Sequence, residues 1–133
     1  MVESLSFELV TPDKHFLSGY ADMVVLPSEN GDIGVMAHHS SLIAMMRPGM
    51  IEVHESGKDI LRYFVNGGYA NIDNNNCTIL AESLIPEAEI NKAEAESLIQ
   101  NLREQLQTTD SEVKKSHIQR KIMEEETKIL LTS

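Results

Sequence analysis

The hydrophobic period of this chain changes at Pro86, and that change limits the folds that the chain can adopt. Before Pro86, apolar residues alternate with polar ones or form short apolar runs, which is the pattern of β-strands. After Pro86, apolar residues recur every three or four positions, which is the pattern of amphipathic helices. The sequence therefore predicts a β domain over residues 1–85 and a helical domain over residues 86–133.

The sequence of residues 1–85 predicts many short strands separated by turns. Leu5, Phe7 and Leu9 alternate with mainly polar neighbours, as expected of a strand with one buried face. The turn at 55–58 joins two such segments into a hairpin. The predicted strands are 2–11, 15–18, 21–26, 50–54, 60–65, 69–72 and 77–82. Short strands with frequent turns are typical of an antiparallel β-sandwich or a flattened barrel.

The second part predicts an antiparallel pair of helices. Pro86 is expected at the first helical position, where its missing N–H has no intrahelical partner to lose. Thr109 and Glu112 have the spacing of a capping box and predict the start of the second helix. The apolar positions are Ala95, Leu98, Leu102 and Leu106 in the first helix, and Val113, Ile118, Ile122, Ile129 and Leu130 in the second. A short connection makes the two helices antiparallel neighbours.

The stretch 26–50 is predicted to be mainly loop, because it holds most of the turn-forming residues of the chain. Pro27 is expected to end the preceding strand. Four polar residues in this stretch are candidates for a binding site: Glu29, Asp32, His38 and His39. Adjacent histidines point to opposite sides of a strand and lack the spacing of paired metal ligands, so no metal site is expected.

Charge and cysteine content exclude several classes of protein. The net charge of −10 argues against nucleic-acid binding, which depends on clustered cations. The single cysteine, Cys77, cannot form an intramolecular disulfide and is expected to pack as a small apolar residue. No segment approaches the roughly 20 apolar residues of a membrane span. These features predict a soluble protein from a reducing compartment.

The sequence lacks the common catalytic motifs that would indicate an enzyme. The sequence contains no phosphate-binding P-loop, no Gly-x-Ser-x-Gly and no His-Glu-x-x-His. Asp32, His38, His39 and His54 could in principle form an acid–base group, but no motif specifies that they converge. We therefore expect no catalytic residue and no cofactor. The alternative from another class is a small ligand-binding or metal-dependent β-barrel enzyme.

Two runs of residues resemble the epsilon subunit of bacterial F-type ATP synthases. The first run contains Gly-Asp-Ile-Gly-Val at 31–35, then His39, Leu42 and Pro-Gly-Met-Ile at 48–51. The second contains Val-Asn-Gly-Gly-Tyr at 65–69 and Thr-Ile-Leu-Ala-Glu at 78–82. Their order and spacing agree with the family pattern. The layout of a β domain followed by a helical hairpin extends the resemblance over residues 1–133.

The resemblance implies a noncatalytic rotor subunit in the central stalk of a proton-translocating ATP synthase. Residues 1–85 would bind the gamma subunit and the c ring, and residues 86–133 would form a regulatory hairpin. Asp32 and His39 match positions that face the c ring in the family, and Glu29 and His38 are further candidates. The protein would lie at the cytoplasmic face of the bacterial inner membrane, held there only through the complex.

Four cations in the second predicted helix are the main concentration of positive charge in this acidic chain: Lys114, Lys115, Arg120 and Lys121. Judged by residue type alone, they form a solvated helix face. The resemblance implies that an extended second helix can reach the alpha and beta subunits, where these cations would oppose rotation and inhibit ATP hydrolysis. Asn91 and Glu94 replace the acid and the cation of the family's ATP-sensing pattern, so tight ATP binding is not expected.

Overall fold

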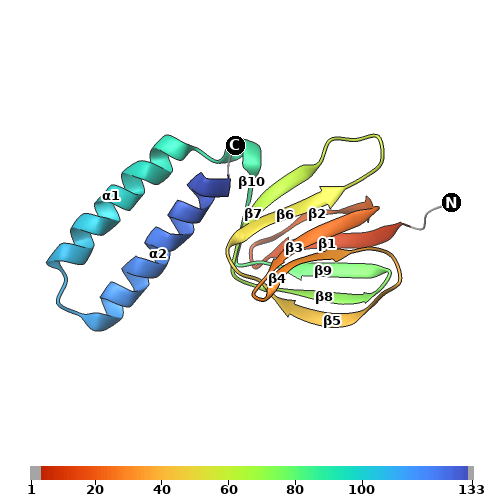
Figure 1. Ribbon diagram of the computed structural model, residues 1–133, viewed down its shortest axis with the longest axis horizontal. Helices are drawn as coiled ribbons and strands as arrows, with labels where there is room; N and C mark the ends of the chain where they lie inside the picture. The colour runs from red at the N-terminus through yellow and green to blue at the C-terminus, as the bar shows by residue number, and fades with distance from the viewer. Residues whose placement is uncertain (1–3, 132–133) are drawn as a thin grey trace. The chain divides into compact units, whose positions relative to one another are not determined.

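The computed structural model describes residues 4–131 and divides into two compact units on either side of the Glu87–Ala88 bond (Figure 1). The first unit is a β-sandwich and the second is a two-helix hairpin. This confirms the predicted fold class.

The sandwich consists of two five-stranded sheets. The first sheet has the order β2-β1-β9-β8-β5 and the second has the order β10-β7-β6-β3-β4. The first sheet contains β1 (Leu5–Thr11), β2 (Lys14–Ala21), β5 (His39–Met45), β8 (Tyr69–Asn74) and β9 (Asn76–Leu80). The second contains β3 (Met23–Ser28), β4 (Gly31–Val35), β6 (Gly49–His54), β7 (Leu61–Asn66) and β10 (Ser83–Pro86). Neighbouring strands are antiparallel, except that β1 and β9 run parallel.

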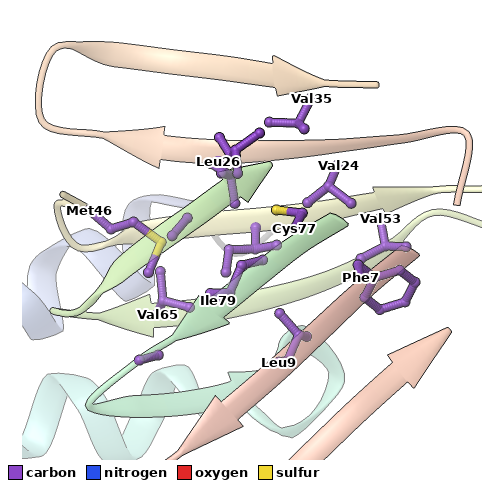
Figure 2. Packing of buried hydrophobic residues seen from close by; sticks show 14 of the residues in the cluster. Phe7, Leu9, Val24, Leu26, Val35, Met46, Val53, Val65, Cys77 and Ile79 are labelled. Carbon is purple, nitrogen blue, oxygen red and sulfur yellow. The ribbon is translucent and has the colours of Figure 1, made fainter. Parts of the chain in front are cut away.

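The core lies between the two sheets and follows from the alternating pattern of the strands. Leu5, Phe7 and Leu9 of β1 are all buried, as the period of two requires. Figure 2 shows side chains from strands of both sheets meeting in this core, among them Leu26 from β3 and Ile79 from β9. Full burial of a Leu or Ile side chain contributes about 1.5–3 kcal/mol. This core therefore fixes the loops and strand ends that the sandwich presents to solvent.

The Cys77 thiol belongs to the same core (Figure 2). Cys77 is only 1% exposed, and burial raises the pKa of its thiol to about 12. At pH 8 the reactive thiolate is then about one part in ten thousand. We expect negligible reaction with a disulfide reagent such as DTNB in native buffer, and stoichiometric reaction in 6 M guanidinium chloride. Rapid labelling of the native protein, with its circular dichroism spectrum unchanged, would contradict this burial.

The stretch 26–50 is not mainly loop, so that prediction is wrong. It contains β4 and β5, and β3 continues through Pro27 to Ser28. Gly31, at φ 126°, allows a tight turn between β3 and β4, so the glycines mark a hairpin instead of a long loop. Pro27 is tolerated because the pairing of β3 with β6 covers only Met23 to Val25, and no ladder hydrogen bond from Pro27 to β6 is required.

Gly67 and Gly68 carry the chain from one sheet to the other. Both have positive φ angles, 70° and 103°, and they connect β7 of the second sheet to β8 of the first. The backbone passes very close to β9 here, because a Cβ added to Gly68 would lie 2.0 Å from the carbonyl oxygen of Leu80. The two glycines therefore form a close crossover between the sheets.

Pro86 does not begin a helix, which corrects a second prediction. It ends β10, a four-residue edge strand that pairs with β7, with Pro86 opposite Tyr63. Proline fits the end of an edge strand because no further ladder hydrogen bond is required there. The predicted strand 77–82 is also wrong at its end, since β9 stops at Leu80 and β10 follows. Arg62 on β7 then forms an ion pair of 2.8 Å with Glu87, the last residue of the first unit.

In the second unit, α1 (Lys92–Thr108) is followed by α2 (Glu112–Leu131). Asn91 caps α1, its side-chain oxygen accepting from the Glu94 N–H at 3.1 Å. Ser111 caps α2 by accepting from the Lys114 N–H at 3.3 Å, so the predicted cap at Thr109 is wrong.

The apolar stripes of the hairpin are narrower than predicted. Ala95, Ile99 and Leu102 of α1 are buried, and Ile118 is the buried apolar residue of α2. Val113 and Leu130 are instead largely exposed, because they fall outside the stripe that faces α1. Among the described residues, no helix is long and apolar enough to cross a membrane.

Candidate functional site

The four predicted site residues lie at the two ends of β5 instead of in one loop. Glu29 is in the β3–β4 turn, and its N–H donates to the carbonyl of Met45, the last residue of β5, at 2.9 Å. His39 is the first residue of β5. A strand of this length spans about 20 Å. The structure therefore brings Glu29 near Asp32 and separates both from His38 and His39, because the intervening residues form strands.

The acidic end of this region contains an ion pair that sequence reasoning missed. Asp32 lies at the start of β4, and its side chain is 65% exposed. Its Oδ1 accepts a hydrogen bond from Nη2 of Arg47 at 2.6 Å. Nη1 of Arg47 donates to the carbonyl of Ser28 on the other strand of the same hairpin. The only sequence signal was the Arg-Pro-Gly run at 47–49, which indicates a turn but not its partner.

A hollow of about 300 Å³ adjoins this ion pair. Residues 28–33 of the β3–β4 hairpin line one side, and residues 42–45 of β5 line the other. Ile43 and Met45 are 66% and 52% exposed. Carboxylates thus stand beside exposed apolar side chains, an arrangement that suits a polypeptide partner better than a small ion.

The histidine end has a different chemistry. His38 has a positive φ of 66° in the turn before β5, and its N–H donates to the Asn75 side chain at 2.8 Å. Nδ1 of the His39 ring lies 2.7 Å from the carbonyl oxygen of Ser40. Both histidines therefore take part in local turn structure. Within residues 4–131, no three His, Cys, Asp or Glu side chains gather in a way that could hold a metal ion.

A second exposed surface lies on the outer face of the first sheet. Met45, Tyr69, Leu80 and Val10 are register partners on four adjacent strands, and we call them the apolar row. A hollow of about 520 Å³ adjoins the apolar row. Met45 lines this hollow and also the hollow beside Asp32, so the two surfaces are continuous. Sequence reasoning missed this surface, because alternation does not distinguish an exposed apolar face from a buried one.

The four predicted cations all lie on α2, but they differ in their neighbours. Lys115 pairs with Glu112 at 3.6 Å, and Lys121 pairs with Glu124 at 3.7 Å. Among the described residues, neither Lys114 nor Arg120 forms an ion pair, and both are exposed. The positive charge available to a partner therefore comes mainly from these two residues.

Comparison with known proteins connects both units to one family. Residues 4–87 match the family model described as ATP synthase, Delta/Epsilon chain, beta-sandwich domain. The chain is 39% identical over 117 residues to the ATP synthase epsilon chain of Paramagnetospirillum magneticum, covering 88% of each protein. It is 36% identical over 124 residues to that of Rhizobium leguminosarum bv. trifolii, covering 93% of this chain and 92% of the relative.

Two solved structures share the fold. One is a chain from the Euglena gracilis mitochondrial ATP synthase OSCP/F1/c-ring assembly, with a TM-score of 0.82 and 20% identity over 93% of this chain and 78% of that one. The other comes from the Tetrahymena thermophila mitochondrial ATP synthase central stalk and c ring, with a TM-score of 0.69 and 13% identity over 99% and 98%. Both likenesses span the sandwich and the hairpin.

Proposed function

The chain belongs to the ATP synthase delta/epsilon chain family, and from this premise we propose that it couples the gamma subunit to the c ring of a proton-translocating F-type ATP synthase. It is a noncatalytic central-stalk chain, so the chemistry of ATP synthesis belongs to other subunits. Membership in this family displaces the alternative of a small ligand-binding or metal-dependent β-barrel enzyme. The observation that carries the coupling proposal is the presence of two exposed surfaces that meet at Met45 on one sandwich.

The apolar row is proposed to bind gamma. A subunit that transmits torque needs a partner that stays bound, and burial of apolar side chains is the main source of lasting association. Met45, Tyr69 and Leu80 are exposed large apolar residues on one face of a sheet. The 520 Å³ hollow beside them offers room for side chains of the partner.

The acidic end, with Asp32 and Glu29, is proposed to face the polar loops of the c ring. Polar and charged groups at an interface set register and specificity, as coupling to a ring of repeated subunits requires. His39 and His38 remain candidates for the same contact. Their position at the other end of β5 means that a contact including them would run along the strand.

The two units have separate proposed roles. The first unit binds gamma and the c ring, and the second is a regulatory hairpin that reaches the alpha and beta subunits when it extends. These roles correspond to the domains 1–85 and 86–133, with the structural boundary at Glu87. The chain would lie at the cytoplasmic face of the bacterial inner membrane through its partners, and it needs no cofactor of its own.

Cross-linking tests the ring assignment. Cysteine placed at position 32 should form a disulfide with a cysteine in the polar loop of subunit c in the intact complex, and cysteine at position 39 tests whether the contact continues along β5. Lys58→Cys is the control, because the β6–β7 turn lies at the opposite end of the second sheet from the β3–β4 turn. Equal yields from positions 32 and 58, or none from position 32 in an assembled complex, would reject the assignment.

The α2 cations give a second expected result. Replacing Lys114, Lys115, Arg120 and Lys121 by alanine should raise ATP hydrolysis by the soluble complex and leave assembly unchanged. Charge-assisted contacts to acidic loops would be lost. Because Lys115 and Lys121 already pair within α2, Lys114→Ala with Arg120→Ala should give most of the effect. If hydrolysis were unchanged in the fourfold variant but rose on deletion of residues 88–133, the hairpin would inhibit sterically and not through these charges.

A further inference from the structure

Arg47 forms hydrogen bonds to both strands of the β3–β4 hairpin, which carries Asp32. It lies in the short connection between β5 and β6, and its own N–H donates to the carbonyl of Pro27 at 2.9 Å. Its guanidinium donates from Nη1 to the carbonyl of Ser28 and from Nη2 to Oδ1 of Asp32. One residue therefore contacts both strands of the β3–β4 hairpin, 15 positions from the carboxylate that it binds.

The backbone around Arg47 is fixed on both sides. Ser28 forms an isolated β-bridge with Met46, and Glu29 donates to the carbonyl of Met45. On the other side, Gly49 packs so closely on Pro27 that an added Cβ would lie 2.7 Å from the Pro27 Cβ. Because this backbone is anchored, the Arg47 side chain reaches Asp32 from a defined starting point, and its planar fork sets the direction of both hydrogen bonds.

Stability alone does not account for this arrangement. The Asp32 and Arg47 side chains are 65% and 43% exposed, and exposed ion pairs add little to folding stability. The pair instead fixes the direction of the carboxylate and places a cation beside it. Within residues 4–131 no protein group donates a hydrogen bond to Oδ2 of Asp32, which leaves that oxygen for a partner.

We propose that Arg47 is a positioning residue for the ring contact: it fixes Oδ1 of Asp32, so that the partner binds an oriented ion pair through Oδ2 instead of a free, rotating carboxylate. This inference rests on the proposed assignment of the acidic end to the c ring. The chemical consequence is that the partner meets the Glu29 carboxylate, for which residues 4–131 provide no cation, beside the Asp32 carboxylate, which is paired with Arg47. The partner group at Asp32 should then be a hydrogen-bond donor that shares the carboxylate with Arg47.

The first measurement uses the isolated full chain. Arg47→Gln should accelerate amide hydrogen exchange in the turn 28–31 and change the chemical shifts of its amides, and Arg47→Lys should do so less. Arg103→Gln is the matched control, because Arg103 forms a similar exposed pair of 3.0 Å with Glu126 in the hairpin. Equal exchange in the turn for wild type and Arg47→Gln would overturn the positioning role.

The second measurement uses the assembled complex with a cysteine at position 29 and a cysteine in the polar loop of subunit c. Arg47→Gln should lower the rate of cross-link formation by about threefold or more, as expected for residues in direct contact. Asp32→Asn should lower it as well, and the double variant no further, because the two residues act as a unit. Additive effects, or an unchanged rate in Arg47→Gln, would overturn the inference.

The two measurements separate this inference from the proposed function. If the wild-type chain gives no cross-link to subunit c, the ring assignment fails, and the exchange experiment still decides whether Arg47 orients Asp32. If the wild-type chain cross-links normally and Arg47→Gln behaves identically in both experiments, the ring assignment holds and the role of Arg47 is wrong.

Discussion

Replacing Gly68 with alanine is expected to destabilise the sandwich by at least about 3 kcal/mol, a large part of the total stability of a domain of this size. The φ of 103° is a conformation that residues with a Cβ rarely adopt. The added Cβ would also lie 2.0 Å from the carbonyl oxygen of Leu80 and 2.7 Å from the Cα of Ala81. Relief of that overlap requires backbone movement, so the crossover would have to separate from β9.

Gly57→Ala is the matched control for Gly68→Ala. Gly57 also has a positive φ, 76°, but no heavy atom lies within 4 Å of the Cβ that alanine would add, so only the conformational cost of about 1 kcal/mol applies. Urea unfolding followed by circular dichroism would give both free energies. Equal losses in the two variants would show that the close approach to β9 does not determine stability at Gly68.

Two truncated chains that end only five residues apart, at Glu87 and at Glu82, should differ clearly in stability. A chain that ends at Glu87 is expected to fold, because it retains β10 and the ion pair between Arg62 and Glu87. A chain that ends at Glu82 should have a free energy of unfolding about 2–5 kcal/mol lower, because this truncation removes the buried Leu84 and exposes the edge of β7. β10 is the last strand of the second sheet, so its removal also leaves unpaired backbone groups on a hydrophobic strand.

Thermal unfolding and size-exclusion chromatography of the two fragments would test this expectation. The Glu87 fragment should be monomeric and unfold cooperatively, while the Glu82 fragment should unfold at a lower temperature or aggregate. Equal stability of the two fragments would mean that β10 contributes nothing to the sandwich. Failure of the Glu87 fragment to fold would contradict the independence of the first unit.

The parts of the fold with long, regular hydrophobic patterns were predictable from the sequence. The alternation in β1 reflects one buried face, which side-chain type alone reveals, and the turn residues at 55–58 indicate the hairpin of β6 and β7. The helical hairpin was predictable for the same reason, since Ala95 and Leu102 follow the helical period. The resemblance to a known family added the expected function, which hydrophobic periodicity and composition do not provide.

The errors occur where tertiary contacts override local signals. The glycines at 31 and 34 favoured a loop, yet pairing with β3 makes a strand of that segment. Proline is common at the first position of a helix, yet Pro86 pairs with the edge of β7 and ends a strand. Arg47 could not be connected with Asp32 from the sequence, because their contact depends on how β5 returns beside the β3–β4 hairpin.

The most direct test of the coupling role is whether the tagged chain captures gamma and c subunits from solubilised membranes. The variants Met45→Asp and Ile60→Asp serve as a matched pair in this experiment. The two side chains are similarly exposed, 52% and 48%, but only Met45 belongs to the apolar row. Unchanged thermal unfolding of both variants would confirm that they fold. The wild-type chain and Ile60→Asp should capture both subunits, and Met45→Asp should lose gamma. Capture of gamma by Met45→Asp at the wild-type level, or of neither subunit by the wild-type chain, would contradict the account.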